Sequence, residues 1–193
     1  MLLLISLNST SQNLDSLWTI WNDTSRADTS RLEAIDKIVV NGYLYSKPDS
    51  AFYFAGLQYD FAESVNNKEW MSNALNMQGV SFAIIDDLAK AIDYYTRSLK
   101  IKEEIGDKQG IASSLGNIGL IYDEQGDYNK AISYFTKSLK IFEELGNKSG
   151  IAGNLNNIGL IYDIQEDYSK AIDYYNRSLK MDQELGNKSG IAT

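Results

Sequence analysis

A 40-residue repeat is the feature of this sequence that most constrains its fold. Residues 107–146 and 147–186 agree at 25 of 40 positions without a gap. The preceding segment, 67–106, shares 16 positions with its neighbour, and 27–66 is a weaker copy. Because one such unit cannot bury its apolar face alone, the repeat predicts an array in which each unit stacks on the next.

Apolar residues within each repeat follow helical spacing. One set, Leu115, Ile118, Gly119 and Tyr122, lies at i, i+3, i+4 and i+7. A second set, Ala131, Phe135, Ser138 and Phe142, lies at i, i+4, i+7 and i+11. This spacing predicts two helices per repeat and an all-α fold, with a turn at 125–127. The expected helices cover 29–44, 48–65, 70–84, 88–105, 110–125, 128–145, 150–165 and 168–185, after a short helix near 13–21 that buries Trp18 and Trp21.

Small residues are expected where the two helices of a pair approach closely. The pattern places Gly119 against Ala131 and Ser138, and the next repeat has the same small residues at Gly159, Ala171 and Ser178. A larger side chain at Gly119 would push the helices apart, at a cost of roughly 1–3 kcal/mol.

The repeats also define the domain organisation. The segments are 1–12, an N-terminal helix and linker at 13–26, a degenerate repeat at 27–66, full repeats at 67–106, 107–146 and 147–186, and the start of a further repeat at 187–193. Residues 1–12 are typical either of the end of a secretory signal, in an exported or periplasmic protein, or of a frayed N-terminus in a cytoplasmic one. The segment 190–193 matches 150–153, the start of a first helix.

Residues repeated at fixed positions carry a family resemblance: Leu115, Ile118, Gly119, Tyr122, Gly126, Tyr128, Ala131, Phe135, Ser138 and Leu139, then Leu155, Ile158, Gly159, Tyr162, Tyr168, Ala171, Tyr175, Ser178 and Leu179. The pattern resembles the tetratricopeptide repeat in its 40-residue form, strongly over 67–186 and weakly over 27–66. The resemblance implies a right-handed α-solenoid of antiparallel helix pairs. Glu166 departs from it, at the position of the turn glycine Gly126. The N-terminal half also looks similar to the sensory arrays of bacterial histidine kinases and nucleotide cyclases.

Composition excludes several function classes. The chain has no cysteine and no histidine, so disulfides, thiolate zinc sites, cysteine nucleophiles and histidine bases are absent. Its formal charge of −8 is the wrong sign for binding nucleic acid or anionic lipid, and no apolar stretch suits membrane insertion. The segment 146–149 superficially resembles the end of a phosphate-binding loop, but it recurs once per repeat and predicts a turn. We therefore expect no catalysis, cofactor or metal site.

Asparagines recur in register on the first helix of each repeat, opposite its core stripe. In stacked helix pairs this face lines the concave surface, and an amide offers both a donor and an acceptor to a peptide backbone. The predicted groove residues are Asn73, Asn76, Asn117, Leu120, Asp123, Asn156, Asn157, Leu160 and Asp163. Relatives resembling kinesin light chain use asparagines at the positions of Asn117 and Asn157. The alternative is that these amides only bridge successive helices.

These features predict a non-enzymatic interaction module that binds a peptide or protein segment in the groove. Asp123, Asp163 and the net charge favour a basic ligand. A solenoid normally needs a polar capping helix, so the last helix should leave Ile172, Tyr175 and Leu179 partly uncovered and available for self-association. The alternative function is the sensory or dimerisation part of a bacterial signalling enzyme, a histidine kinase or nucleotide cyclase, whose catalytic domain lies outside this sequence.

Overall fold

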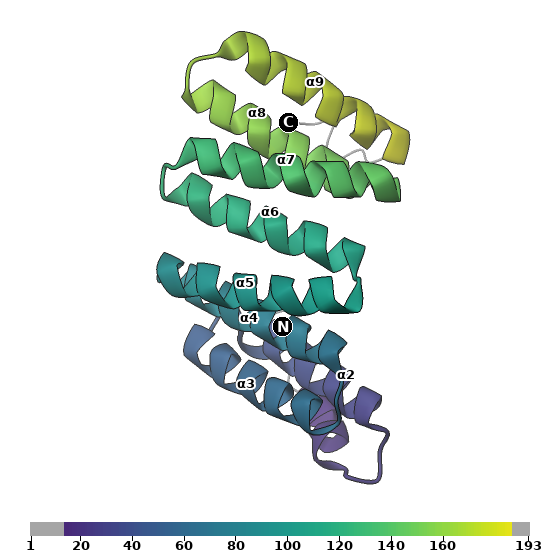
Figure 1. The fold of residues 1–193 in the computed structure, drawn as a ribbon. Helices are drawn as coiled ribbons and strands as arrows, with labels where there is room; N and C mark the ends of the chain where they lie inside the picture. The colour runs from purple at the N-terminus through teal and green to yellow at the C-terminus, as the bar shows by residue number, and fades with distance from the viewer. Residues whose placement is uncertain (1–13, 187–193) are drawn as a thin grey trace, which may run out of the picture. The chain divides into compact units, whose positions relative to one another are not determined.

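The computed structural model describes residues 14–186, which form two compact units that divide after Ile101. No residue within 14–186 lies in a β-strand, and short turns join the helices. In Figure 1 successive helices of each unit run back and forth beside one another. The expectations for residues 1–12 and 187–193 lie outside the described part of the chain. The all-α fold of consecutive helix pairs is confirmed, whereas the handedness of the array stays a prediction.

Unit 1 begins with a helix over residues 14–22. It continues with α2 (Asp28–Ile38), a π-helix (Val39–Tyr43), α3 (Pro48–Ser64), α4 (Lys68–Ile84) and α5 (Leu88–Ile105), whose end belongs to unit 2. Trp18 and Trp21 are partly buried against a core that includes Ile35, so they lie on the buried side of this helix, as predicted. The expected helix at 29–44 changes from α to π geometry at Val39.

Unit 2 contains α6 (Lys108–Glu124), α7 (Tyr128–Leu145), α8 (Lys148–Ile164) and α9 (Tyr168–Leu185). Its core joins α7 to α8, with Ala131, Phe135, Leu139, Leu155, Ile158 and Ile161 all buried. This packing follows from the sequence pattern, because the apolar stripe of the second helix in one repeat meets the first helix of the next.

Every turn between helices from α3 to α9 uses the same device, repeated at 20-residue intervals. A residue in the left-handed conformation ends one helix, at Asn66, Asp86, Gly106, Gly126, Gly146 and Glu166. The next residue caps the following helix through its side-chain oxygen, at Asn67, Asp87, Asp107, Asp127, Asn147 and Asp167. Asn147 Oδ1, for example, accepts from the Gly150 N–H at 3.0 Å. The segment 146–149 is therefore a turn and a helix cap, as predicted.

The close contact at Gly119 differs from the prediction. A Cβ added there would lie 2.8 Å from Phe135 Cε1, and its three nearest neighbours all belong to the Phe135 ring, where Ala131 and Ser138 were expected. The Ser138 hydroxyl instead donates to the Ala112 carbonyl at 2.8 Å. The physical reason is that the large ring crosses the pair and leaves no room for a side chain on the facing turn of α6.

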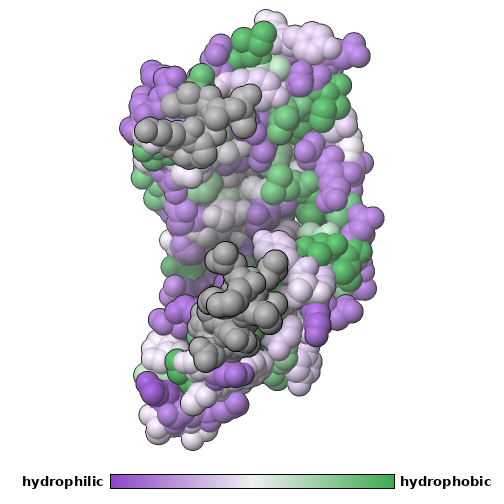
Figure 2. Space-filling view, turned by 180° about the vertical axis from the view of Figure 1, so that it is seen from behind, coloured by the Kyte–Doolittle hydropathy of each residue, from purple (hydrophilic) through white to green (hydrophobic). Residues whose placement is uncertain are grey.

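The surface of the described residues mixes polar and apolar side chains. Figure 2 shows hydrophilic residues in purple beside hydrophobic residues in green on the face that it presents. No helix within residues 14–186 combines the length and the hydropathy that crossing a bilayer requires.

Candidate functional site

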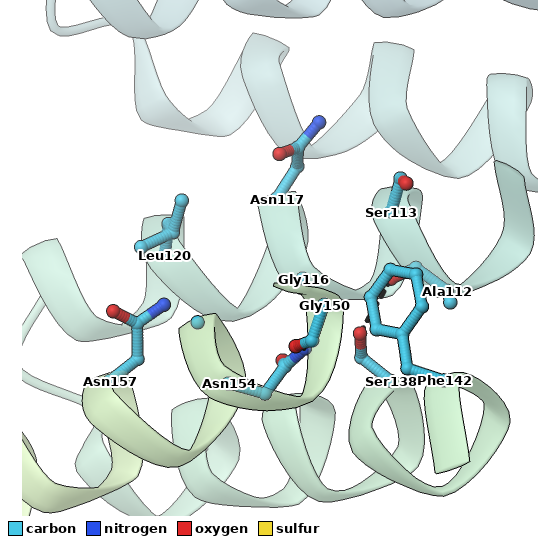
Figure 3. Close-up of a pocket in the computed structure, with 11 residues that line it drawn as sticks. Ala112, Ser113, Gly116, Asn117, Leu120, Ser138, Phe142, Gly150, Asn154 and Asn157 are labelled. Carbon is cyan, nitrogen blue, oxygen red and sulfur yellow. Dashed lines mark hydrogen bonds between the residues drawn. The ribbon is translucent and has the colours of Figure 1, made fainter. Parts of the chain in front are cut away.

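Unit 2 carries an open pocket between α6 and α8, with α7 at its base. Its volume is about 240 Å³. The lining residues come from all three helices, and Figure 3 shows them as sticks: Ala112, Ser113, Gly116, Asn117 and Leu120 on α6, Ser138 and Phe142 on α7, and Gly150, Gly153, Asn154 and Asn157 on α8. Helices that are adjacent in space but 40 residues apart in sequence thus build one site.

The structure brings three of the predicted groove residues together in this pocket. Asn117 and Asn157 occupy the same position in consecutive repeats, and both are half-buried. Leu120, 46% exposed, lies one helical turn after Asn117. The register arises because equivalent positions of stacked repeats lie beside one another. Asn117 also makes an interaction within the chain, so the bridging role stays an alternative for this residue.

Fixed side chains form the base of the pocket. The Ser138 hydroxyl is held by the Ala112 carbonyl, and the Phe142 ring is 6% exposed. Asn154 is equally buried and donates from Nδ2 to the Gly150 carbonyl at 2.8 Å. A side chain committed to a backbone carbonyl, or packed within the core, loses little further freedom when a ligand arrives. The base is therefore preorganised.

The remaining predicted residues of unit 2 lie outside the pocket lining. Asn156, Leu160 and Asp163 are exposed on α8. Asp123 lies in the last turn of α6 and is half-buried, and its Oδ1 is buried without a hydrogen-bond partner in the described chain. This burial raises the pKa of the Asp123 carboxyl above its ordinary value.

The two predicted residues of unit 1, Asn73 and Asn76, lie on α4 and are half-buried. Asn76 also makes an interaction within the chain. That both continue the groove of unit 2 stays a prediction.

The pocket has no charged lining. Of the described residues, those that line it are all uncharged: glycines, apolar side chains, hydroxyls and amides. A charged ligand group would therefore find no counter-ion inside, whereas an uncharged side chain would lose little solvation on entering. In residues 14–186 no three carboxylates gather in a way that could hold a metal ion.

The sequence analysis did not predict the base of the pocket, namely Ser138, Phe142 and Asn154. It placed Ser138 and Phe142 in the core stripe of their helix and made no assignment for Asn154. One signal was present. Asn154 occupies the repeat position of Ser114 and Ala74, and an amide at a position otherwise held by small residues marks a buried polar group that needs an explanation.

Comparison with solved structures places this fold among several helical-repeat proteins. BtubC from P. vanneervenii is similar with a TM-score of 0.78 and 18% identity, over 94% of this chain and 74% of that one. Aspartyl phosphate phosphatase F from Bacillus subtilis gives 0.80 and 18%, over 86% of this chain and 44% of that one. A Rap protein in complex with competence and sporulation factor gives 0.78 and 18%, over 86% and 46%. The chain thus spans under half the length of the last two.

A sequence search of curated proteins found no significant match. The family model for the tetratricopeptide repeat matches residues 70–144 and 110–184, which together cover more than half of the sequence. The matched region contains all of α6 to α8 and the pocket that they form. The chain belongs to the tetratricopeptide repeat family.

Proposed function

We propose that this protein is a non-catalytic interaction module that binds an extended peptide, or a segment of another protein, in the groove between α6 and α8. The observation that carries the proposal is the pocket with Asn117 and Asn157 in register at its rim. Amides that repeat along a groove can pair with the repeating N–H and C=O groups of an extended backbone. The absence of histidine and cysteine supports a binding role over catalysis.

The comparison with a Rap protein in complex with competence and sporulation factor supports a ligand-binding role for this architecture. That protein is similar in fold at 18% identity, so its ligand is not carried over. The proposal for this chain depends on its own groove residues.

The test is a selection from a random peptide library displayed on phage, first against the wild-type chain and then against Asn117→Ala with Asn157→Ala. Each lost amide removes hydrogen bonds with a net contribution of roughly 0.5–1.5 kcal/mol, so the double variant should bind selected peptides about ten- to a hundred-fold more weakly. Equal recovery of the same peptides by both proteins would exclude the amide clamp. Thermal melting provides the control, because a loss of cooperative melting in the variant would assign the amides to helix bridging.

We also propose that the preferred ligand carries basic residues in the part that lies outside the pocket. Asp123 and Asp163 each lie six residues, nearly two helical turns, beyond Asn117 and Asn157, and the chain has a net charge of −8. Because no charged residue of the described chain lines the pocket itself, lysine or arginine should flank the inserted part of the ligand. Affinity should then fall as salt concentration rises; a salt-independent affinity would contradict the basic preference.

A second proposal concerns α9, which we propose contacts a second copy of the chain. On α7, Ile132 and Tyr128 pack against the core shared with α8, whereas the equivalent Ile172 and Tyr168 of α9 are 60% and 59% exposed. Because α9 repeats the surface of α7 that α8 covers, we expect a second copy of the chain to cover the exposed Ile172 and Tyr168.

Light scattering over a range of concentrations tests this contact. We expect Ile172→Glu to reduce self-association, and Thr136→Glu, which adds the same charge to an exposed position of α7, to leave it unchanged. A wild-type chain that stays monomeric at high concentration would contradict the proposal.

The signalling-enzyme alternative stays a hypothesis about a longer protein. Sequencing the encoding DNA beyond the codon for Thr193 tests it, since a frame that continues into a kinase or cyclase domain would favour it and an immediate stop codon would exclude it.

A further inference from the structure

Two glycines inside helices face the pocket with no packing reason for being glycine. A Cβ added at Gly153 would meet nothing within 4 Å, and one at Gly116 would approach only Ser138 Oγ at 3.7 Å and Asn154 Oδ1 at 4.0 Å. Both glycines lie in the middle of their helices, where alanine is the more stable residue. Glycine at these two positions therefore lowers the stability of α6 and α8 but leaves the pocket open.

Other helical glycines of unit 2 behave differently. A Cβ at Gly119 or Gly159 would lie 2.8 Å from an aromatic ring, and one at Gly150 would lie 2.5 Å from the Phe142 ring. Those three glycines are required by packing. Gly116 and Gly153 differ also from the equivalent positions of neighbouring repeats, which hold asparagine or serine.

Asn154 provides an independent observation that points to a ligand. Its side chain is 6% exposed and is directed toward α6, with Oδ1 4.0 Å from the Cβ position of Gly116 (Figure 3). Nδ2 donates to the Gly150 carbonyl, but no donor within residues 14–186 bonds to Oδ1. Asn154 is not among the described residues whose buried polar atoms have no partner, so Oδ1 is open to the pocket and can accept from water or from a bound group.

The geometry points to a specificity subsite, and we propose that this pocket takes one uncharged ligand side chain with an apolar body and a hydrogen-bond donor at its tip: tyrosine, tryptophan or glutamine. The glycines admit the body of the side chain, Phe142 packs against it, and Asn154 Oδ1 accepts from its tip. The volume of about 240 Å³ exceeds the roughly 150 Å³ of an engineered cavity that binds benzene. The inference rests on the proposed peptide-binding function.

The experiment measures the affinity of a fluorescein-labelled peptide, chosen from the phage selection described above, for four forms of the full chain. Gly153→Leu fills the pocket and should weaken binding roughly ten- to a hundred-fold, as expected when one side chain loses its burial. Asn154→Ser, which places in α8 the residue that α6 has at Ser114, should weaken binding roughly two- to tenfold. Ser133→Leu adds the same bulk at an exposed position of α7 and should leave affinity unchanged.

A second readout separates specificity from structure. Peptides selected by the wild type should share tyrosine, tryptophan or glutamine at one position, and peptides selected by Asn154→Ser should shift to leucine or phenylalanine there. Binding that depends on Asn117 and Asn157 but is unchanged in Gly153→Leu and Asn154→Ser would overturn the subsite and leave the groove proposal standing. If no peptide is selected by the wild type, both proposals fail.

Discussion

Replacing Glu166 by glycine should stabilise the protein, because this residue has a left-handed backbone that suits glycine. Its φ is 60°, and the equivalent Gly126 has a φ of 74°. The two turns are otherwise alike. The N–H of Glu166 donates to the Asp163 carbonyl, and the N–H of Asp167 donates to the Tyr162 carbonyl, both at 2.9 Å. The N–H groups of Gly126 and Asp127 make the same two bonds, to the Asp123 and Tyr122 carbonyls, also at 2.9 Å. The substitution should therefore preserve the turn.

The expected gain follows from two opposing contributions. A residue with a Cβ is destabilised by about 1–2 kcal/mol in the left-handed region. Glycine offsets part of this gain, because it increases the entropy of the unfolded chain by about 0.4–1 kcal/mol. The net effect is about 0.5–1 kcal/mol. For a chain of 193 residues this raises the melting temperature by about 1–4 °C.

Thermal and urea unfolding, followed by far-ultraviolet circular dichroism, measure the effect. Glu166→Gln is the control for charge, because it removes the repulsion from neighbouring Asp167 while keeping a side chain, and it should have no effect. Gly126→Ala is the reverse experiment. Nothing lies within 4 Å of a Cβ added there, so its expected loss of stability comes from the backbone alone.

Two results would refute this reasoning. If Glu166→Gln stabilises as much as Glu166→Gly, charge repulsion and not backbone conformation limits the turn. If Glu166→Gly leaves the melting temperature unchanged, the strain of the left-handed residue does not exceed the entropic cost of glycine.

Three further changes test the packing of unit 2. Gly119→Ala should lower the free energy of unfolding by about 1–3 kcal/mol because its Cβ would lie 2.8 Å from the Phe135 ring; unchanged stability in urea would contradict this contact. Phe135→Tyr should raise stability by about 1 kcal/mol by adding a hydroxyl donor for the buried Asp123 Oδ1. The equivalent tyrosine of the next repeat, Tyr175, interacts electrostatically with the equivalent Asp163. Carbon-13 titration should show the pKa of Asp123 moving back toward 3.8. Burial lowers the pKa of Lys102 below 10.5, so the unfolded chain holds this proton more tightly and stability should rise as pH increases toward 10.5; Lys102→Met should remove that rise, and an identical pH dependence in the variant would contradict it.

The sequence alone determined the secondary structure and the family. The predicted helix boundaries agree with the structure to within two residues from α3 to α9, because the signals that set them are local. A cap such as Asn147 satisfies an N–H three residues later, and a left-handed residue such as Gly146 ends the preceding helix. The change to π geometry at Val39 has no such signal, and it was not predicted.

Contacts between helices were predicted only in part. The repeat identified Gly119 as a close-approach position, but the atoms nearest to a Cβ added there belong to the Phe135 ring, which was not predicted as its partner. Sequence spacing shows which residues share a face. It does not show which side chain of the facing helix reaches a given turn, because that depends on rotamers and on the crossing of the two helices.

The pocket was decided by the tertiary structure. Asn117 and Asn157 were predicted from their register, since equivalent positions of stacked repeats recur side by side. Its base joins Ser138, Phe142 and Asn154 from two helices, of which Ser138 and Phe142 were predicted as core and Asn154 was not assigned. All three side chains are buried to the degree of core residues. The space beside Gly116 and Gly153, between α6 and α8, nevertheless leaves one side of each of them open to a ligand. Periodicity specifies the face of a helix, whereas only the packing of three helices specifies an empty volume.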